Sequence, residues 1–159
     1  MADSDPLSLT DLKRPLRPWL FPLLGAASAS AFEPLNLWPV GLLAFAILAA
    51  QLRSAAHPAG AAFIGWLFGL GHFTAGLIWI ATAFTYQNDM PAWLGYVGVV
   101  MLSVYLALFP AAAALGTALL QRRFAGWRYP LLFGALWIIT EWLRSWLFTG
   151  FAWNPLGII

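Results

Sequence analysis

Two charged residues stand inside an otherwise apolar segment near the end of the sequence. They are Glu141 and Arg144, within residues 136–159, LWIITEWLRSWLFTGFAWNPLGII. Residues three apart share one face of a helix, so the carboxylate and the guanidinium can pair. A charge within a bilayer costs roughly 3 kcal/mol on insertion scales, and such residues usually face a bundle interior or a wet cavity. The pattern predicts a functional site. The alternatives are a purely structural pair, or an Arg144 side chain that reaches the membrane interface.

The chemistry that these residues favour is the binding of an anion. A guanidinium donates two parallel hydrogen bonds to a phosphate, so Arg144 is the candidate to bind a lipid phosphate, with Glu141 orienting it. Gly150 and Pro155 end the helix shortly afterwards. The candidate substrate-binding residues are Glu141, Arg144, Trp146, Trp153 and Asn154. No residue is assigned a catalytic or a metal-binding role. His72, within another apolar segment, is either a proton carrier or a histidine bonded to a neighbouring helix.

The composition indicates that transmembrane helices position these residues. Hydrophobic residues make up 62% of the sequence and charged residues only 9%, which is typical of an integral membrane protein. With ~20 residues per crossing, 159 residues hold about five spanning helices. We predict an all-α membrane protein, a polytopic bundle of about five transmembrane helices, the first two forming a short hairpin. The expected segments are 19–32, 40–52, 59–84, 92–120 and 129–148.

Residues 1–18 are expected to form a cytoplasmic tail and residues 19–159 a transmembrane helical domain. Residues 19–32 also fit a cleavable signal peptide, because a basic stretch precedes them and their last part, residues 27–31, consists of Ala and Ser. In the third segment, Ala61, Gly65 and Gly69 recur every four residues, a spacing that lets helices approach closely in lipid. In the fourth segment, Pro110 is expected to kink or shorten the helix.

The basic residues predict the orientation. Five crossings place seven of them on the side of the N-terminus and none in the opposite loops: Lys13, Arg14, Arg17, Arg53, Arg122, Arg123 and Arg128. Cytoplasmic loops are rich in Lys and Arg, so the N-terminus is expected inside the cell and Ile159 at the outer face.

The same residues form no basic face, and no nucleic acid is expected as a partner. The sequence contains no cysteine, which excludes disulfides, thiolate metal sites and a cysteine nucleophile within it. No cofactor is expected.

The stretch EWLRSWLFTGFAWNPLG, residues 141–157, resembles the signature of the bacterial apolipoprotein N-acyltransferases, E-x-L-R-G-W-x-x-T-G-F-P-W-x-x-x-G. Ser145 replaces the usual Gly and Ala152 the usual Pro. GLGHFTAGLIW, residues 69–79, also resembles the third helix of this family. Similarity extends over nearly the whole sequence.

The resemblance implies transfer of an acyl chain from a phospholipid donor to the N-terminal amine of a diacylated lipoprotein, in the bacterial inner membrane. In this family a Glu-Lys-Cys triad acts through a cysteine thioester, in an outer-face nitrilase-like domain that would follow Ile159. We therefore expect a truncated product or fragment that anchors the enzyme and holds lipid substrates but is inactive alone. Its partners would be the phospholipid, the lipoprotein and membrane lipids.

Two other functions remain open from the sequence. One is a non-catalytic membrane module of a polyprenol-phosphate mannose synthase type system. The other is a small transporter, against which the sequence shows no inverted repeat and few ionisable residues within its apolar segments.

Overall fold

The computed structural model describes residues 15–86, 91–147 and 155, and in these ranges it is helical without strands. The elements are α1 (Leu20–Ala29), α2 (Trp38–Arg53), α3 (Pro58–Leu77), α4 (Ile80–Ala83), the 3-10 helix η2 (Phe84–Tyr86), α5 (Trp93–Leu106), α6 (Leu108–Leu120) and α7 (Arg128–Trp146). The all-helical prediction is confirmed for this part of the chain.

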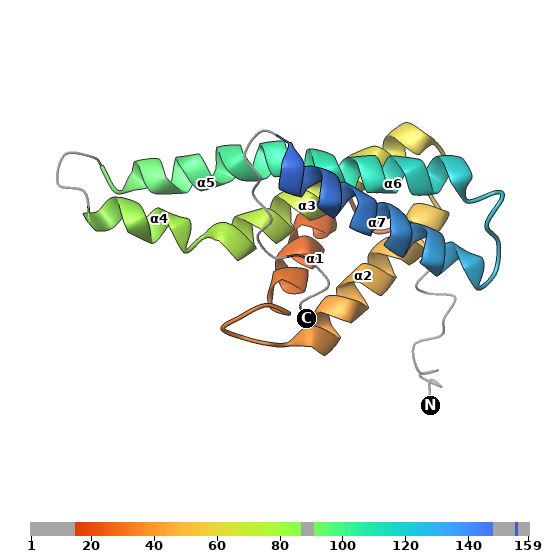
Figure 1. The fold of residues 1–159 in the computed structure, drawn as a ribbon, viewed down its shortest axis with the longest axis horizontal. Helices are drawn as coiled ribbons and strands as arrows, with labels where there is room; N and C mark the ends of the chain where they lie inside the picture. The colour runs from red at the N-terminus through yellow and green to blue at the C-terminus, as the bar shows by residue number, and fades with distance from the viewer. Residues whose placement is uncertain (1–14, 87–90, 148–154, 156–159) are drawn as a thin grey trace, which may run out of the picture.

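The helices pack around α3. Helices α5 and α6 lie end to end along the long axis of the molecule, and α3 and α4 run beside them in the opposite direction (Figure 1). Helix α1 packs mainly on α3, and α7 lies obliquely against α6 (Figure 1). This arrangement places Arg144, in the last turn of α7, beside Phe73 of α3.

Two helical stretches are long and apolar enough to cross a membrane, Pro58–Leu77 and the nearly continuous Trp93–Leu120. Helices α1 and α2 have only 10 and 16 residues, fewer than the ~20 that a crossing usually requires. Helix α7 has 19 residues but includes Arg128, Glu141 and Arg144. Five crossings therefore remain a prediction.

Pro110 interrupts the long helix as the sequence predicts. Helix α5 ends at Leu106 and α6 begins at Leu108. Proline has no backbone N–H, so the carbonyl of Leu106, four residues earlier, lacks its helical donor. Regular bonding resumes with the amide of Ala111, which donates to Ala107 O at 3.1 Å.

Small residues make the contact between α3 and α6, which confirms the close packing predicted from their spacing. A Cβ added at Gly65 would lie 2.6 Å from the Cβ of Ala114, and one at Gly69 would lie 2.8 Å from Pro110 Cγ. Ala61 is fully buried on the same helix. Any larger side chain would separate the two helices.

Helix α1 crosses α3 backbone against backbone. A Cβ at Gly25 would overlap the carbonyl oxygen of Phe68, and a Cβ at Gly71 would overlap that of Pro22. Helices α1 and α2 also touch, and Gly41 of α2 lies close to Ser28 O of α1, so they form contacts as a hairpin would. The larger neighbour of α1 is nevertheless α3.

Candidate functional site

Arg144 lies in the last turn of α7 and is only 2% exposed. Its guanidinium carbon is 4.8 Å from the centroid of the Phe73 ring on α3, a cation–π contact. The alternative in which Arg144 reaches the membrane interface is therefore wrong, because the side chain turns into the bundle.

The guanidinium of Arg144 is incompletely bonded. Its Nε and Nη1 atoms are buried and have no hydrogen-bond partner among the described residues. Buried polar groups are nearly always bonded, and an exception requires an explanation such as a bound ion or a ligand. Two donors on one planar cation have the geometry that a phosphate or carboxylate accepts.

Glu141 lies one turn before Arg144, and its carboxylate accepts a hydrogen bond from Trp137 Nε1 at 3.0 Å. Glu141 is half-buried and lies on the same helix as Arg144. Trp137 is itself buried, with its ring centroid 4.8 Å from that of Phe45. Glu141 is thus fixed by the core of the bundle rather than by Arg144 alone.

His72 is buried beside this pair and joins α3 to α1. Its Nδ1 lies 2.7 Å from Ser28 Oγ, and the Ser28 hydroxyl donates to Gly25 O at 2.6 Å. Because that hydroxyl has one proton, Nδ1 of His72 must be the donor to Ser28 Oγ. The interpretation of His72 as a histidine bonded to a neighbouring helix is confirmed.

Aromatic rings enclose His72. The rings with centroids within about 6 Å of it belong to Phe32, Phe45, Phe68 and Phe73. Phe73 is the same ring that Arg144 covers. The candidate site is therefore an arginine, a histidine and a carboxylate held by three helices in an apolar surrounding, which suits the binding of an anion. No group of three or more His, Cys, Asp or Glu side chains in the described ranges could hold a metal ion.

Of the three remaining candidate residues, the structure describes only Trp146. Trp146 ends α7 and is 75% exposed. Trp153 and Asn154 lie outside the described residues. Sequence reasoning missed Trp137, Phe73 and Ser28. Trp137 could have been found, since it precedes Glu141 by four residues on one helix; nothing in the sequence connects Phe73 or Ser28 with α7.

Comparison with known proteins identifies the family of this chain. The family model described as "Apolipoprotein N-acyltransferase N-terminal domain" matches residues 24–159. Proteins named apolipoprotein N-acyltransferase from Nitrosomonas europaea and Ralstonia nicotianae are 40% and 41% identical, over 84% and 82% of this chain. One from Rhodopseudomonas palustris is 42% identical over 85% of the chain. The matched region is 27%, 25% and 26% of these relatives, respectively, so the chain spans about a quarter of their length. This chain belongs to the apolipoprotein N-acyltransferase family.

Proposed function

We propose that this chain is the N-terminal membrane part of an enzyme that transfers an acyl chain from a phospholipid to the N-terminal amine of a diacylated lipoprotein. Its own share of that activity is to anchor the enzyme and to hold the lipid substrates, and the acyl transfer takes place elsewhere in the whole protein. Membership of the family and the relatives' names support the reaction.

The main support for lipid binding at Glu141 and Arg144 is the incomplete hydrogen bonding of the Arg144 guanidinium. A buried guanidinium with two unused donors is costly, because the energy of removing a charge from water is recovered only through good partners. The phosphate of a phospholipid supplies a negative charge and acceptor oxygens together. We propose that Glu141, whose carboxylate accepts a hydrogen bond from Trp137 Nε1, orients the guanidinium from one turn earlier on α7. We propose that Trp146, Trp153 and Asn154 contact the same lipid or its head group.

The proposed setting is the bacterial inner membrane, crossed by about five helices, with the N-terminus in the cytoplasm and Ile159 at the outer face. The positions of the arginines support it. Arg53 ends α2, Arg122 and Arg123 follow α6, and Arg128 begins α7, all at the helix ends that five crossings would place inside. Arg144 lies at the other end of α7, near the outer face, where the lipoprotein substrate would be modified.

The test is phospholipid binding by the purified protein in detergent, measured by native mass spectrometry with phosphatidylglycerol as the probe. Arg144→Met should weaken binding about tenfold or more, because hydrogen bonds to a charged group contribute about 1.5–3 kcal/mol. Arg144→Lys should retain part of it, since the charge remains but the paired donors do not. Arg128→Met is the matched control, because Arg128 is exposed beside Trp127.

Diacylglycerol, which has the same chains but no phosphate, separates phosphate recognition from general lipid adhesion. Its binding should be the same in the parent protein and in Arg144→Met. Equal phosphatidylglycerol binding by Arg144→Met and the parent protein would contradict the proposal that Arg144 binds the lipid phosphate.

A further inference from the structure

Phe73 of α3 contacts the guanidinium of Arg144 from a different helix. The guanidinium carbon lies 4.8 Å from the ring centroid, within the ~6 Å over which the face of an aromatic ring attracts a cation. Phe73 is 3% exposed and Arg144 is 2% exposed, so water screens little of this attraction. Cation–π contacts are strongest when the cation is desolvated. The ring therefore supplies much of the attraction that keeps this cation inside the bundle.

An aromatic ring holds a guanidinium in a different way from a carboxylate. The ring attracts the charge through its electron-rich face, whereas a carboxylate accepts paired hydrogen bonds from the guanidinium nitrogens. Nε and Nη1 of Arg144 have no hydrogen-bond partner among the described residues. A carboxylate in the place of the ring would occupy such donors. Phe73 thus holds the cation while these donors stay available to a ligand.

The structure fixes the Phe73 ring itself through neighbouring helices. The ring belongs to a buried cluster that includes Val99 and Leu106 of α5 and its continuation toward α6. It also meets the ring of His72 in a T-shaped contact, with the centroids 5.1 Å apart. His72 is hydrogen-bonded to Ser28 of α1, which restrains rotation of α3 about its axis. Contacts from α1 and α5 therefore set the place at which the ring meets Arg144.

We propose that Phe73 is a positioning residue of the phosphate site, whose ring holds the Arg144 guanidinium with unused donors until the lipid phosphate binds. This inference rests on the proposed function of Arg144 and adds the residue that presents its guanidinium. Without the ring, the guanidinium would turn toward acceptors inside the bundle, such as backbone carbonyl oxygens. A lipid phosphate would then have to displace those acceptors. Phe73 thus acts on phosphate binding through Arg144.

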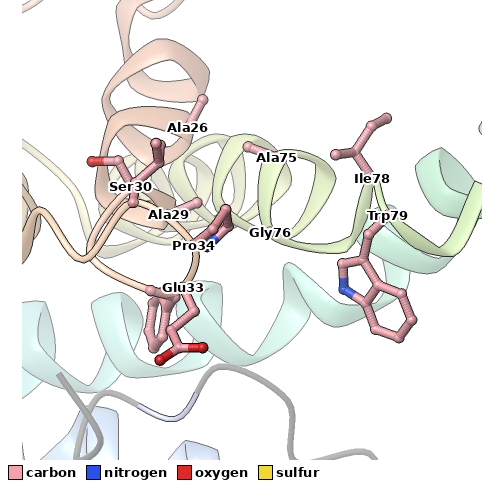
Figure 2. Close-up of a pocket in the computed structure, with 11 residues that line it drawn as sticks. Ala26, Ala29, Ser30, Glu33, Pro34, Ala75, Gly76, Ile78 and Trp79 are labelled. Atoms are coloured by element: carbon pink, nitrogen blue, oxygen red, sulfur yellow. The ribbon is translucent and has the colours of Figure 1, made fainter.

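A separate cavity near His72 has to be distinguished from this site. It is a pocket of about 210 Å³ between the end of α1, the turn that follows and the end of α3 (Figure 2). Phe32 lines this pocket and contacts the His72 ring, with the centroids 5.8 Å apart. Phe73 and Arg144 are not part of its lining. Hydrocarbon that entered this pocket would bind without help from the guanidinium, so lipid binding has to be measured with and without a phosphate.

The first test removes the aromatic face. Phosphatidylglycerol and diacylglycerol with identical chains are offered separately to the purified protein in detergent, and bound lipid is counted by native mass spectrometry. Phe73→Leu should weaken phosphatidylglycerol binding about fivefold, the effect of one competing hydrogen bond, and should leave diacylglycerol binding unchanged. Phe21→Leu is the matched control, because Phe21 is also buried but belongs to the other hydrophobic cluster. It should bind both lipids as the parent protein does.

Fluorinated phenylalanines at position 73 test the electrostatic contact while the packing is retained. Fluorine withdraws electron density from the ring face and so weakens its attraction for a cation, although the ring keeps nearly the same shape. Phosphatidylglycerol binding should fall stepwise as one, two and three fluorine atoms are introduced, while diacylglycerol binding stays constant. Because these variants preserve the core, the series also decides the question if Phe73→Leu does not fold.

A double-mutant cycle shows whether Phe73 acts through Arg144. In the Arg144→Met protein, Phe73→Leu should have no further effect on phosphatidylglycerol binding, because no cation remains to be positioned. A purely structural role of the ring would instead lower the binding of both lipids in both backgrounds, and would overturn the inference. Parent-like phosphatidylglycerol binding throughout the fluorinated series, with Arg144→Met still weakened, would overturn this inference alone. An Arg144→Met protein that binds normally would contradict the proposed function itself.

Discussion

The guanidinium of Arg144 lies over the ring of Phe73, with its central carbon 4.8 Å from the ring centroid. Phe73 follows His72, which in turn is bonded to Ser28. One arginine at the end of α7 is thereby linked through α3 to α1, three elements that are far apart in the sequence. The charge is held in place by packing, while two of its donors remain unused.

Replacing this arginine should not unfold the protein. Arg144→Met removes a buried charge with incomplete bonding, and apolar replacements of such charges are often neutral or stabilising by about 1–4 kcal/mol. Glu141→Leu should lower the thermal midpoint, because it removes the negative charge beside Arg144 and leaves Trp137 Nε1 without its carboxylate. The double variant should recover stability. Thermal unfolding followed by circular dichroism measures these midpoints. A large decrease of the midpoint in Arg144→Met alone would contradict the expectation.

The crossing of α1 and α3 should tolerate no side chain at its centre. In Gly71→Ala the new Cβ would overlap the carbonyl oxygen of Pro22, and overpacking of this kind typically costs about 1–3 kcal/mol. Gly98→Ala is the control, because its Cβ meets open space and alanine favours a helix by up to about 1 kcal/mol. The two variants should therefore change the midpoint of thermal unfolding in opposite directions. Equal midpoints would mean that the helices separate easily.

The hydrogen bond between Ser28 and His72 should contribute to the stability of the fold beyond the packing of the two side chains. Ser28→Ala would leave Nδ1 of His72 buried without an acceptor, at a cost of about 1–3 kcal/mol. Combining it with His72→Phe should recover much of this loss, because both polar partners are then gone. A double-mutant cycle on thermal stability measures the coupling. Additive effects of the two changes would show that the bond contributes nothing.

The orientation can be tested by single cysteines, since the sequence has none of its own. In intact cells an impermeant thiol reagent should label Leu35→Cys but not Arg123→Cys. Position 35 is preferable to 36, because Asn36 has a φ of 51°, a backbone conformation that cysteine adopts poorly. Leu35 is 61% exposed. The reverse labelling pattern would invert the proposed topology.

A polypeptide of these 159 residues should transfer no acyl chain. The thioester chemistry implied by the family requires a thiolate, and no cysteine is present to supply it. Incubation with a labelled phospholipid and a diacylated lipopeptide should give no triacylated product, while phospholipid still binds. The matched control is the same chain followed by the remainder of a relative's sequence. Turnover by the 159 residues alone would refute the division between substrate binding and catalysis.

Local patterns predicted more of this structure than long-range contacts did. The break near Pro110 and the contacts of Gly65 and Gly69 follow from rules that act within one helix or along one face. The placement of Glu141 and Arg144 on α7 was likewise foreseen. Their bonding was not, because spacing alone does not tell whether an arginine turns toward its neighbour or onto a ring from another helix.

A pocket between the turn after α1 and the end of α3 could not have been predicted for a similar reason. It depends on how the turn after α1 folds back beside the end of α3, and residues 33 and 75 are brought together only by the crossing at Gly25 and Gly71. Glycines permit close approach, but they do not identify the partner helix.

The packing of α1 on α3 rather than mainly on α2 has a consequence for biosynthesis. When the ribosome has made α1 and α2, the surface that covers Gly25 does not yet exist, because Phe68 and Gly71 come later in the chain. A helix of 10 residues is too short to be held firmly by lipid alone. Helix α1 can therefore reach its packed position only after α3 has been synthesised. The first helix of the chain would complete its packing later than its place in the sequence suggests.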